Sequence, residues 1–226
     1  MNVAILVAAG RGARMGRDKL FLEVAGKPVV AHTWARFDEA RCIDEIVIVV
    51  RAGMEKKFAA LAKKYKFRKK FQIVTGGAER QDSVWAGLEA APPKAQIVAV
   101  HDAARPCVNN DLIAATVKYA EETGAAVAAH PVTDTIKESA DGRLITRTLD
   151  RAKLWSVQTP QTFRVEIIRH AISLARERGL HLTDDTAACE LAGHPVRLVA
   201  GAAPNPKVTV PDDLPYIELL LKRGVE

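Results

Sequence analysis

The stretch that decides the fold is residues 3–22, VAILVAAGRGARMGRDKLFL. Its first five residues are apolar and rich in β-branched side chains, which is typical of a strand buried on both faces of a sheet. Glycines follow at Gly10, Gly12 and Gly16, and four cations lie within the nine residues from Arg11 to Lys19. Glycine lets the backbone turn sharply and approach a ligand, while clustered cations attract negative charge. The stretch therefore predicts a strand followed by a loop that binds a polyanion.

Two common phosphate-binding motifs do not match this loop. A dinucleotide-binding loop requires G-x-G-x-x-G and an acidic residue about 20 positions later, but the third glycine, Gly16, comes one residue too late. A Walker loop requires Lys and Ser or Thr after its last glycine, and here Arg17 and Asp18 follow. Two interpretations remain. One is a solvated basic loop, and the other is a nucleotidyltransferase loop in which Lys19 reaches the phosphoryl group being transferred.

Length and composition indicate an ordinary globular protein. The chain has 226 residues, of which 48% are hydrophobic and 27% charged, enough for one large α/β domain or two small ones. We expect a single domain over residues 1–226. No apolar run approaches the roughly 18 residues that span a bilayer, and no signal peptide precedes the first strand. Three widely spaced cysteines form no C-x-x-C pair, which argues against a disulfide framework or a zinc site. These features predict a cytoplasmic protein without a membrane partner.

The net charge of +6 permits a nucleic-acid partner, a phosphorylated substrate, or no specific partner at all. Much of the excess positive charge lies in residues 56–70, where seven lysines alternate with apolar residues at helical spacing. That pattern is typical of the solvated face of an amphipathic helix. Only 5% of the residues are aromatic, so side chains on which bases could stack are few. We therefore expect no nucleic-acid partner.

Apolar runs alternate with amphipathic segments along most of the chain. This alternation predicts an α/β protein whose mainly parallel sheet carries helices on both faces. The predicted strands cover residues 3–7, 45–50, 71–75, 97–100, 125–129, 196–199 and 205–210. The predicted helices cover residues 28–40, 53–65, 79–91, 111–122, 164–178, 183–193 and 212–222.

Ligands of such sheets bind at the carboxyl ends of the strands. The first predicted strand ends at the glycine–arginine loop, the third at Gly76-Gly77 and the fourth at HDAARP, residues 101–106. Gly76 and Gly77 would let a base or a ribose lie against the main chain, and Ser83 adds a hydroxyl. Asp102 suits Mg²⁺, which binds proteins through one or two carboxylates together with substrate phosphates. Its alternatives are a helix cap or a partner for Arg105.

Residues 132–156 break the alternation. Short alternating pieces flank Asp141-Gly142, a pair typical of a turn between two antiparallel strands. We interpret the segment as a β-arm that projects from the sheet. An isolated hairpin is only marginally stable, so the arm is expected to pack on a second subunit. Arg151, near the end of the arm, could hold a second phosphate in a bidentate manner.

Nine motifs, in order along nearly the whole chain, give it a family resemblance. They are VAAGRGARM, DKLFLEVAGKPVV, GGAERQDSV, HDAARP, PVTDTIK, TLDRAKLW, QTPQTF, LTDDTAACE and NPKVTVPDDL. Together they resemble the 2-C-methyl-D-erythritol 4-phosphate cytidylyltransferase family of the non-mevalonate isoprenoid route. The ribitol 5-phosphate cytidylyltransferases share most of the nucleotide-side motifs and remain the alternative. The resemblance implies a Rossmann-like nucleotidyltransferase fold, CTP and a polyol phosphate as substrates, Mg²⁺ or another divalent cation, and a homodimer joined through the arm.

The resemblance also implies roles for particular residues of this chain. The catalytic cations would be Arg14, Lys19 and Lys207, and the metal ligand would be Asp102. The nucleotide would be bound by Ala8, Ala9, Gly10, Gly12, Gly77, Ser83 and Ala103. The polyol phosphate would be bound by Arg105, Thr135, Arg151 and Thr159, with Arg151 donated across the dimer.

The chain departs from the family pattern at two positions. Val7 stands where a proline often precedes Ala-Ala-Gly, and Ala78 stands where an aspartate often follows Gly-Gly. The first change affects only the stiffness of the loop. The second removes a polar contact on the nucleotide side.

Overall fold

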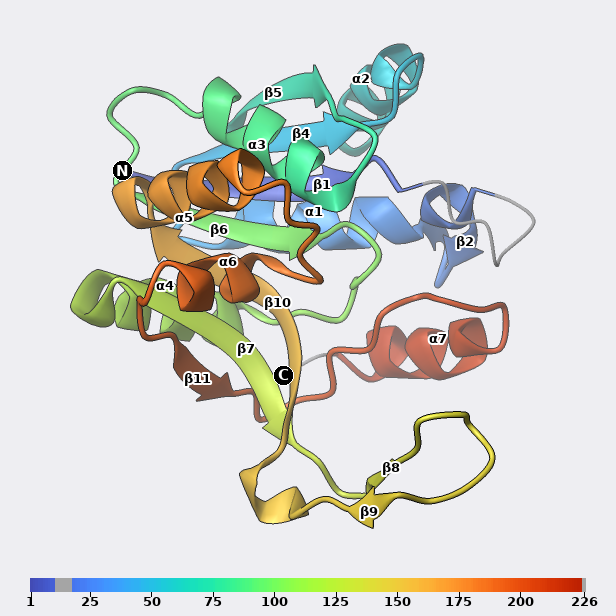
Figure 1. Cartoon of the computed structure of the whole chain (residues 1–226). Helices are drawn as coiled ribbons and strands as arrows, with labels where there is room; N and C mark the ends of the chain where they lie inside the picture. Colours follow the sequence, from blue (N-terminus) through green and yellow to red (C-terminus); the bar gives the residue numbers. More distant parts are fainter. Residues whose placement is uncertain (11–17, 225–226) are drawn as a thin grey trace.

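The structure is a computed structural model that describes residues 1–10 and 18–224. Within these ranges seven strands form one sheet in the order β11-β7-β10-β6-β1-β4-β5 (Figure 1). Their bounds are β1 (Asn2–Ala8), β4 (Glu45–Val50), β5 (Lys70–Thr75), β6 (Ile97–Asp102), β7 (Ala125–Pro131), β10 (Trp155–Arg164) and β11 (Arg197–Ala200). The mainly parallel sheet predicted from the sequence is confirmed.

One long strand, β10, runs against the others. It pairs antiparallel with β6 on one side and with β7 on the other, whereas β5, β4, β1 and β6 pair in parallel. The sequence did not predict this strand because QTPQTF is polar and contains Pro160, and proline is confined to edges and irregularities of sheets. Pro160 lies at such an irregularity, because the register between β10 and β7 shifts between Val157 and Gln161.

Helices cover both faces of the sheet, as predicted (Figure 1). Alternate residues of β1 point to opposite faces, with Leu6 in one buried apolar cluster and Ile5 in another. Helices α1, α2, α4 and α7 contribute to the Leu6 cluster, while α3, α5 and α6 pack on the Ile5 face. The helix bounds are α1 (Val29–Glu39), α2 (Glu55–Tyr65), α3 (Arg80–Ala90), α4 (Asn110–Thr123), α5 (Val165–Glu177), α6 (Asp185–Leu191) and α7 (Asp213–Arg223).

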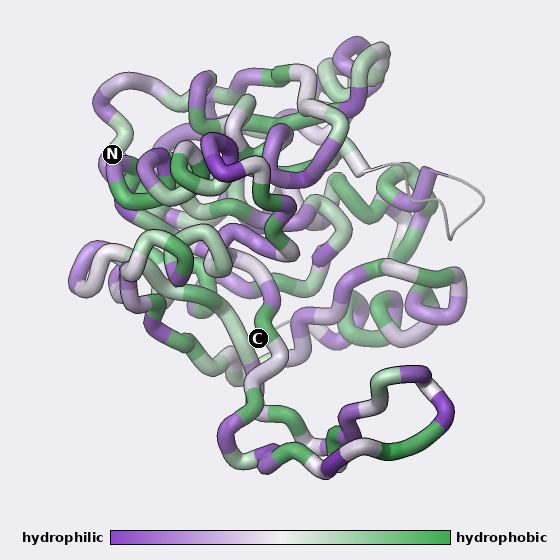
Figure 2. Tube along the Cα trace, in the orientation of Figure 1, coloured by the Kyte–Doolittle hydropathy of each residue, from purple (hydrophilic) through white to green (hydrophobic). Residues whose placement is uncertain are grey.

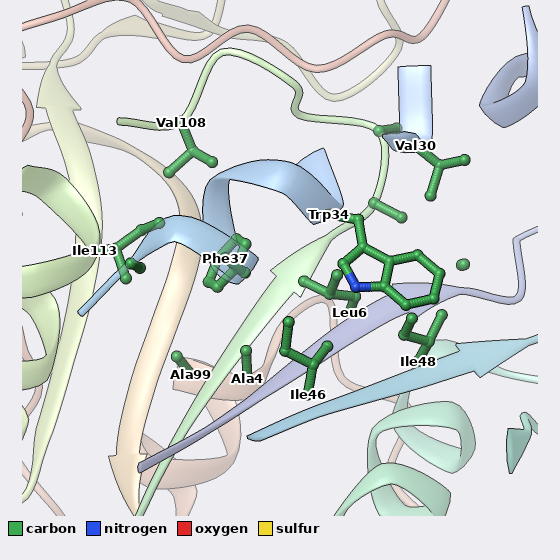
Figure 3. Packing of buried hydrophobic residues seen from close by; sticks show 14 of the residues in the cluster. Ala4, Leu6, Val30, Trp34, Phe37, Ile46, Ile48, Ala99, Val108 and Ile113 are labelled. Carbon is green, nitrogen blue, oxygen red and sulfur yellow. The ribbon is translucent and has the colours of Figure 1, made fainter. Parts of the chain in front are cut away.

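Large side chains of α1 fill the first cluster. Trp34 and Phe37 are fully buried and lie against the sheet beside Leu6, Ile46 and Ile48 (Figure 3). The hydropathy colouring shows hydrophobic strands in the centre and hydrophilic stretches on the outer helices (Figure 2). Burial of this apolar surface is the main free-energy gain of folding, so the sheet forms a rigid base for the loops at its carboxyl edge.

The β-arm projects below the sheet (Figure 1). Its paired part is shorter than the alternation suggests, because only β8 (Lys137–Glu138) and β9 (Arg147–Thr148) form a ladder. The Asp141 side chain closes the tip by accepting hydrogen bonds from the backbone N–H groups of Arg143 and Leu144. The remaining short elements are β2 (Glu23–Val24), β3 (Lys27–Pro28) and the 3₁₀ turns η2 (Lys19–Phe21) and η3 (Arg151–Lys153).

The strand predicted over residues 205–210 is wrong. The structure shows an irregular segment there, which is attached through single hydrogen bonds such as that from Val208 N to Ala104 O, 2.8 Å. The segment has an apolar alternation, but it pairs with none of the strands in the described part of the chain. No helix in the described part of the chain is long and apolar enough to cross a membrane.

Candidate active site

A cavity of about 390 Å³ opens at the carboxyl ends of β1, β4, β5 and β6. Segments from both ends of the chain contribute to it. The lining residues are Val7, Ala8, Ala9, Gly10, Lys19, Leu20, Arg51, Ala52, Gly76, Gly77, Ala78, Glu79, Arg80, Ser83, Asp102, Ala104 and Lys207. The position matches the edge at which parallel sheets bind their ligands.

A carboxylate surrounded by cations lies at the β6 end of the cavity. In the described part of the chain, three cationic groups lie within 4 Å of the Asp102 carboxylate. They are Lys207 Nζ at 2.7 Å, Arg105 Nε at 3.6 Å and Arg80 Nη2 at 3.7 Å. Burial alone would raise the pKa of Asp102, but the cations, Lys207 foremost, outweigh burial and hold this pKa well below its ordinary value. Asp102 is therefore ionised at neutral pH.

Lys19 reaches the same cavity from the N-terminal part of the chain. It lies on the turn η2, and its Nζ donates a hydrogen bond of 2.7 Å to the backbone oxygen of Val208, the neighbour of Lys207. Two lysines that are 188 positions apart in the sequence thus line one cavity. An anion bound there would be attracted to both ammonium groups.

Behind the Asp102 end, a chain of hydrogen bonds fixes the backbone. The Thr159 hydroxyl accepts from Asp102 N (3.1 Å) and lies 3.0 Å from His101 Nδ1, while His101 Nε2 lies 3.2 Å from Arg105 O. Burial lowers the pKa of His101 to about 3, so the imidazole is neutral. With His101 Nδ1 as acceptor and Nε2 as donor, every bond in the chain has one donor and one acceptor.

The same network holds the segment that carries Lys207. Asn205 Nδ2 donates to Thr159 O at 2.8 Å, and Arg105 Nη1 donates to Asn205 O at 2.7 Å. Both residues are largely buried, so these bonds are shielded from water. The irregular segment that carries Lys207 is therefore tied to Arg105 and Thr159 without being part of the sheet.

At the β5 end, the two glycines are required by close packing. A Cβ on Gly76 would lie 2.6 Å from Ser83 Oγ and 2.8 Å from the Cβ of Ala9, and a Cβ on Gly77 would lie 2.3 Å from the Cβ of Asp82. Helix α3 begins at Arg80, and its N-terminus is capped by reciprocal hydrogen bonds between Glu79 and Asp82. Its first turn supplies Arg80 and Ser83 to the cavity. The main chain and small side chains of Gly76, Gly77 and Ala78 leave room for a flat nucleoside at this end.

The structure brings only part of the implied site together. Ala8, Ala9, Gly10, Lys19, Gly77, Ser83, Asp102 and Lys207 line the cavity. Ala103, Arg105 and Thr159 lie behind it, where Ala103 is fully buried and Thr159 is 3% exposed. Thr135 and Arg151 lie on the exposed arm, where Arg151 Nη1 donates to Thr133 O at 2.7 Å. Gly12 and Arg14 fall within residues 11–17, outside the described residues. The roles implied for all these residues stay predictions.

Two further cations line the cavity, Arg51 and Arg80, and the sequence assigned neither of them a role. Arg80 pairs with Asp185 at 2.7 Å and so connects α3 with α6. Arg51 pairs with Asp18 at 3.0 Å. Both arginines follow the carboxyl ends of predicted strands, where ligands of such sheets bind, so their positions in the sequence already indicated that they lie near the site. This rule places residues 76–80, which include Arg80, at the ligand-binding edge, but it does not single out Arg51.

Comparisons with known proteins agree with one another. The family described as IspD: 2-C-methyl-D-erythritol 4-phosphate cytidylyltransferase matches residues 2–223. A 2-C-methyl-D-erythritol 4-phosphate cytidylyltransferase of Alkaliphilus oremlandii is 44% identical over 221 residues, covering 96% of this chain and 94% of its own. The similarity therefore extends over nearly the full length of both proteins.

Solved structures give the same result. The enzyme of that name from Thermus thermophilus has a TM-score of 0.80 and 36% identity, covering 98% of this chain and 100% of its own. A 4-diphosphocytidyl-2C-methyl-D-erythritol synthase from Anaerococcus prevotii has a TM-score of 0.88 and 28% identity, covering 99% and 96%. This chain belongs to the IspD family of 2-C-methyl-D-erythritol 4-phosphate cytidylyltransferases.

Proposed function

We propose that this protein transfers the cytidylyl group of CTP to 2-C-methyl-D-erythritol 4-phosphate in the non-mevalonate isoprenoid route. The products are 4-diphosphocytidyl-2-C-methyl-D-erythritol and pyrophosphate. The observation that carries the proposal is the placement of Lys19, Lys207 and Asp102 around one cavity in a chain of the IspD family. The main chain at Gly76 and Gly77 would accept the nucleoside, and the cations around Asp102 would accept the phosphates.

The main obstacle to this reaction is repulsion between two anions. An oxygen of the acceptor's phosphate must attack the α-phosphorus of CTP, while the bond from that phosphorus to the pyrophosphate oxygen breaks. Lys19 and Lys207 would stabilise the negative charge that accumulates on the α-phosphoryl oxygens and on the departing pyrophosphate. The attacking phosphate is already ionised near pH 7, since its second pKa is about 6. The mechanism therefore needs no general base.

A divalent cation is part of this proposal, and Asp102 is the residue that would hold it. The low pKa of Asp102 supplies an ionised carboxylate facing the cavity. The described residues contain no group of three or more His, Cys, Asp or Glu side chains that could hold a metal ion by themselves. One carboxylate fits Mg²⁺ that is bound together with substrate phosphates. When bound, Mg²⁺ would neutralise phosphate charge and favour departure of pyrophosphate.

We further propose a homodimer in which the arm completes the partner's site. Leu144 and Ile145 at the tip are 75% and 65% exposed, which favours burial against another surface. Arg151 and Thr135 lie on this arm, away from the residues that line the cavity of their own chain. Arg151 would then orient the acceptor phosphate in the neighbouring subunit.

One activity assay tests the reaction and separates its alternatives. The protein is mixed with Mg²⁺, one nucleoside triphosphate and one polyol phosphate, and released pyrophosphate is measured. We expect turnover with CTP and methylerythritol phosphate, and much slower turnover with ribitol 5-phosphate or with UTP, ATP and GTP. Faster turnover with ribitol 5-phosphate would reassign the acceptor, and no turnover with any pair would refute the proposed function.

A mixing experiment tests the shared site. Lys19→Ala and Arg151→Ala variants are each expected to be nearly inactive. In a mixed dimer, one of the two sites combines an intact Lys19 from one chain with an intact Arg151 from the other. Random mixing therefore restores up to about a quarter of wild-type activity if the site is shared in this way. No recovery, with mixed dimers shown to form, would place Arg151 in its own chain's site.

A further inference from the structure

The turn that carries Lys19 is too short to hold its own position. The 3₁₀ turn η2 spans three residues, Lys19–Phe21, and a single turn of this kind has little intrinsic stability. Leu20 is 4% exposed and anchors the turn in the core. Phe21 packs edge to face on Phe58 of α2, with ring centroids 5.2 Å apart. These contacts hold the apolar side of the turn, and Lys19 Nζ is held by Val208 O at 2.7 Å. A further contact fixes the backbone from which Lys19 extends.

Asp18 makes that contact with both of its carboxylate oxygens. Oδ1 accepts the backbone N–H of Leu20 at 3.3 Å and so caps the turn. Oδ2 accepts from Arg51 Nη2 at 3.0 Å. The two bonds use different oxygens, so the cap and the ion pair can form together without competing. Arg51 is thereby connected through Asp18 to the backbone on which Lys19 lies.

Arg51 is itself attached to the central sheet. It follows β4 directly, and the last residue of that strand, Val50, is fully buried. The Arg51 carbonyl accepts the N–H of Met54 at 3.1 Å, which fixes the turn leading to α2. The ion pair therefore joins η2 to the carboxyl end of β4, an inner strand of the central sheet. The side chains of Arg51 and Asp18 are 34% and 25% exposed, so substitutions there leave the core intact.

We propose that Arg51 and Asp18 are positioning residues for the transfer reaction, because their ion pair holds the turn that carries Lys19 at the cavity. This inference rests on the proposed function, in which Lys19 stabilises the charge on the reacting phosphates. Lys19 would keep its chemistry without the pair but lose its alignment. Misplacement of a catalytic group by about 1 Å can cost up to 10²-fold in rate.

Substitutions of Asp18 and Arg51 can separate the effect of the ion pair on kcat from the effect of the cap on η2. Asp18→Asn keeps an oxygen for the Leu20 N–H but removes the charge, and Arg51→Gln removes the charge on the other side. We expect each variant to lower kcat by about tenfold, and the double variant to be no slower than either single variant, because both remove one interaction. Arg51→Lys, which keeps the charge, should retain kcat within about threefold of wild type.

The decisive comparison is made in a Lys19→Ala background. If Arg51 acts through Lys19, adding Arg51→Gln to Lys19→Ala lowers kcat no further. A further tenfold loss would show that Arg51 contacts the substrates directly, and an unchanged kcat in the Arg51→Gln single variant would show that the pair positions nothing. Either result overturns the inference. Normal turnover by Lys19→Ala alone would instead refute the proposed role of Lys19.

A matched control excludes a general effect of removing an ion pair. Arg169 pairs with Glu89 at 2.7 Å, with side chains 35% and 56% exposed, and neither residue lines the cavity. Arg169→Gln should leave kcat at the wild-type value. Thermal unfolding of every variant confirms that the folded state is being compared, and an equal loss of kcat in Arg169→Gln would also overturn the inference.

Discussion

Replacing Thr159 by valine tests whether this residue supports the site from behind or contacts the substrate. The change keeps the size of the side chain and removes its hydroxyl. That hydroxyl is buried and joins Asp102 N, at 3.1 Å, to His101 Nδ1, at 3.0 Å. Valine leaves both groups buried without this partner, and each such loss costs about 1–3 kcal/mol.

We therefore expect Thr159→Val to lower the free energy of unfolding by about 3 kcal/mol in total. For a chain of this length, that corresponds to a fall in Tm of roughly 9 °C. Urea unfolding and thermal melting measure the change, and Thr159→Ser, which retains the hydroxyl, is the control. We also expect kcat to fall, because the backbone that positions Asp102 would relax.

The reasoning is refuted if Thr159→Val is as stable as wild type and raises only the KM for the acceptor phosphate. That result would mean that the hydroxyl serves the substrate, as the family resemblance implies, and that the buried network is unimportant for folding.

Three further predictions concern the surroundings of the site. Because burial lowers the pKa of His101 to about 3, its contribution to stability is present above about pH 6.5 and is lost as pH falls from there towards 3. In His101→Asn, the free energy of unfolding measured in urea should therefore depend less steeply on pH in this range, by up to about 1.4 kcal/mol per pH unit. An unchanged pH dependence would mean that His101 is accessible to protons in the folded state. Lys207→Met removes the cation that lowers the pKa of Asp102 most. The loss in free energy of unfolding relative to wild type should therefore be largest near pH 7 and shrink as pH falls below about 4. A loss that is the same at every pH would contradict the pairing of Lys207 with Asp102. Gly87→Ala places a Cβ 2.5 Å from Ile5 Cγ2 and so pushes α3 away from the sheet. The free energy of unfolding, measured by heat or urea, should fall by about 1–3 kcal/mol. An unchanged free energy of unfolding would show that this contact is loose.

Much of the fold could be predicted because burial and periodicity act locally. The run EIVIVV became β4 with the predicted bounds, and the lysine-rich segment became α2, with Phe58, Leu61 and Ala62 buried. Asn109, which directly precedes α4, caps the helix by accepting the N–H of Leu112. These features depend on residues close together in the sequence, so the sequence pattern alone predicts them.

The failures have the opposite cause. Strand β10 is polar and contains Pro160, and only its two neighbours, β6 and β7, make it a strand. Conversely, residues 205–210 alternate like a strand but have no edge to pair with. In both cases, whether the segment forms a strand depends on pairing with segments that are distant in the sequence. A local sequence pattern cannot predict such pairing.

The site was predictable where a strand end carries the residue, as at Asp102 and Gly77. That rule did not foresee that Arg105 and Thr159 would lie behind the cavity rather than in it, since both take part in hydrogen bonds with the distant Asn205. The pair formed by Arg51 and Asp18 likewise depends on tertiary contact. Sequence motifs located the end of the sheet at which the cavity opens, and the structure was needed to separate residues that line the cavity from those that lie behind it.

The central claim is that ammonium groups from both ends of the chain stabilise one reacting phosphorus. Steady-state pyrophosphate release by Lys19→Ala and Lys207→Ala, with CTP, Mg²⁺ and methylerythritol phosphate at saturation, tests it most directly. We predict that each variant loses about 10²-fold or more in kcat while remaining folded. Wild-type turnover by either variant would contradict the claim for that lysine.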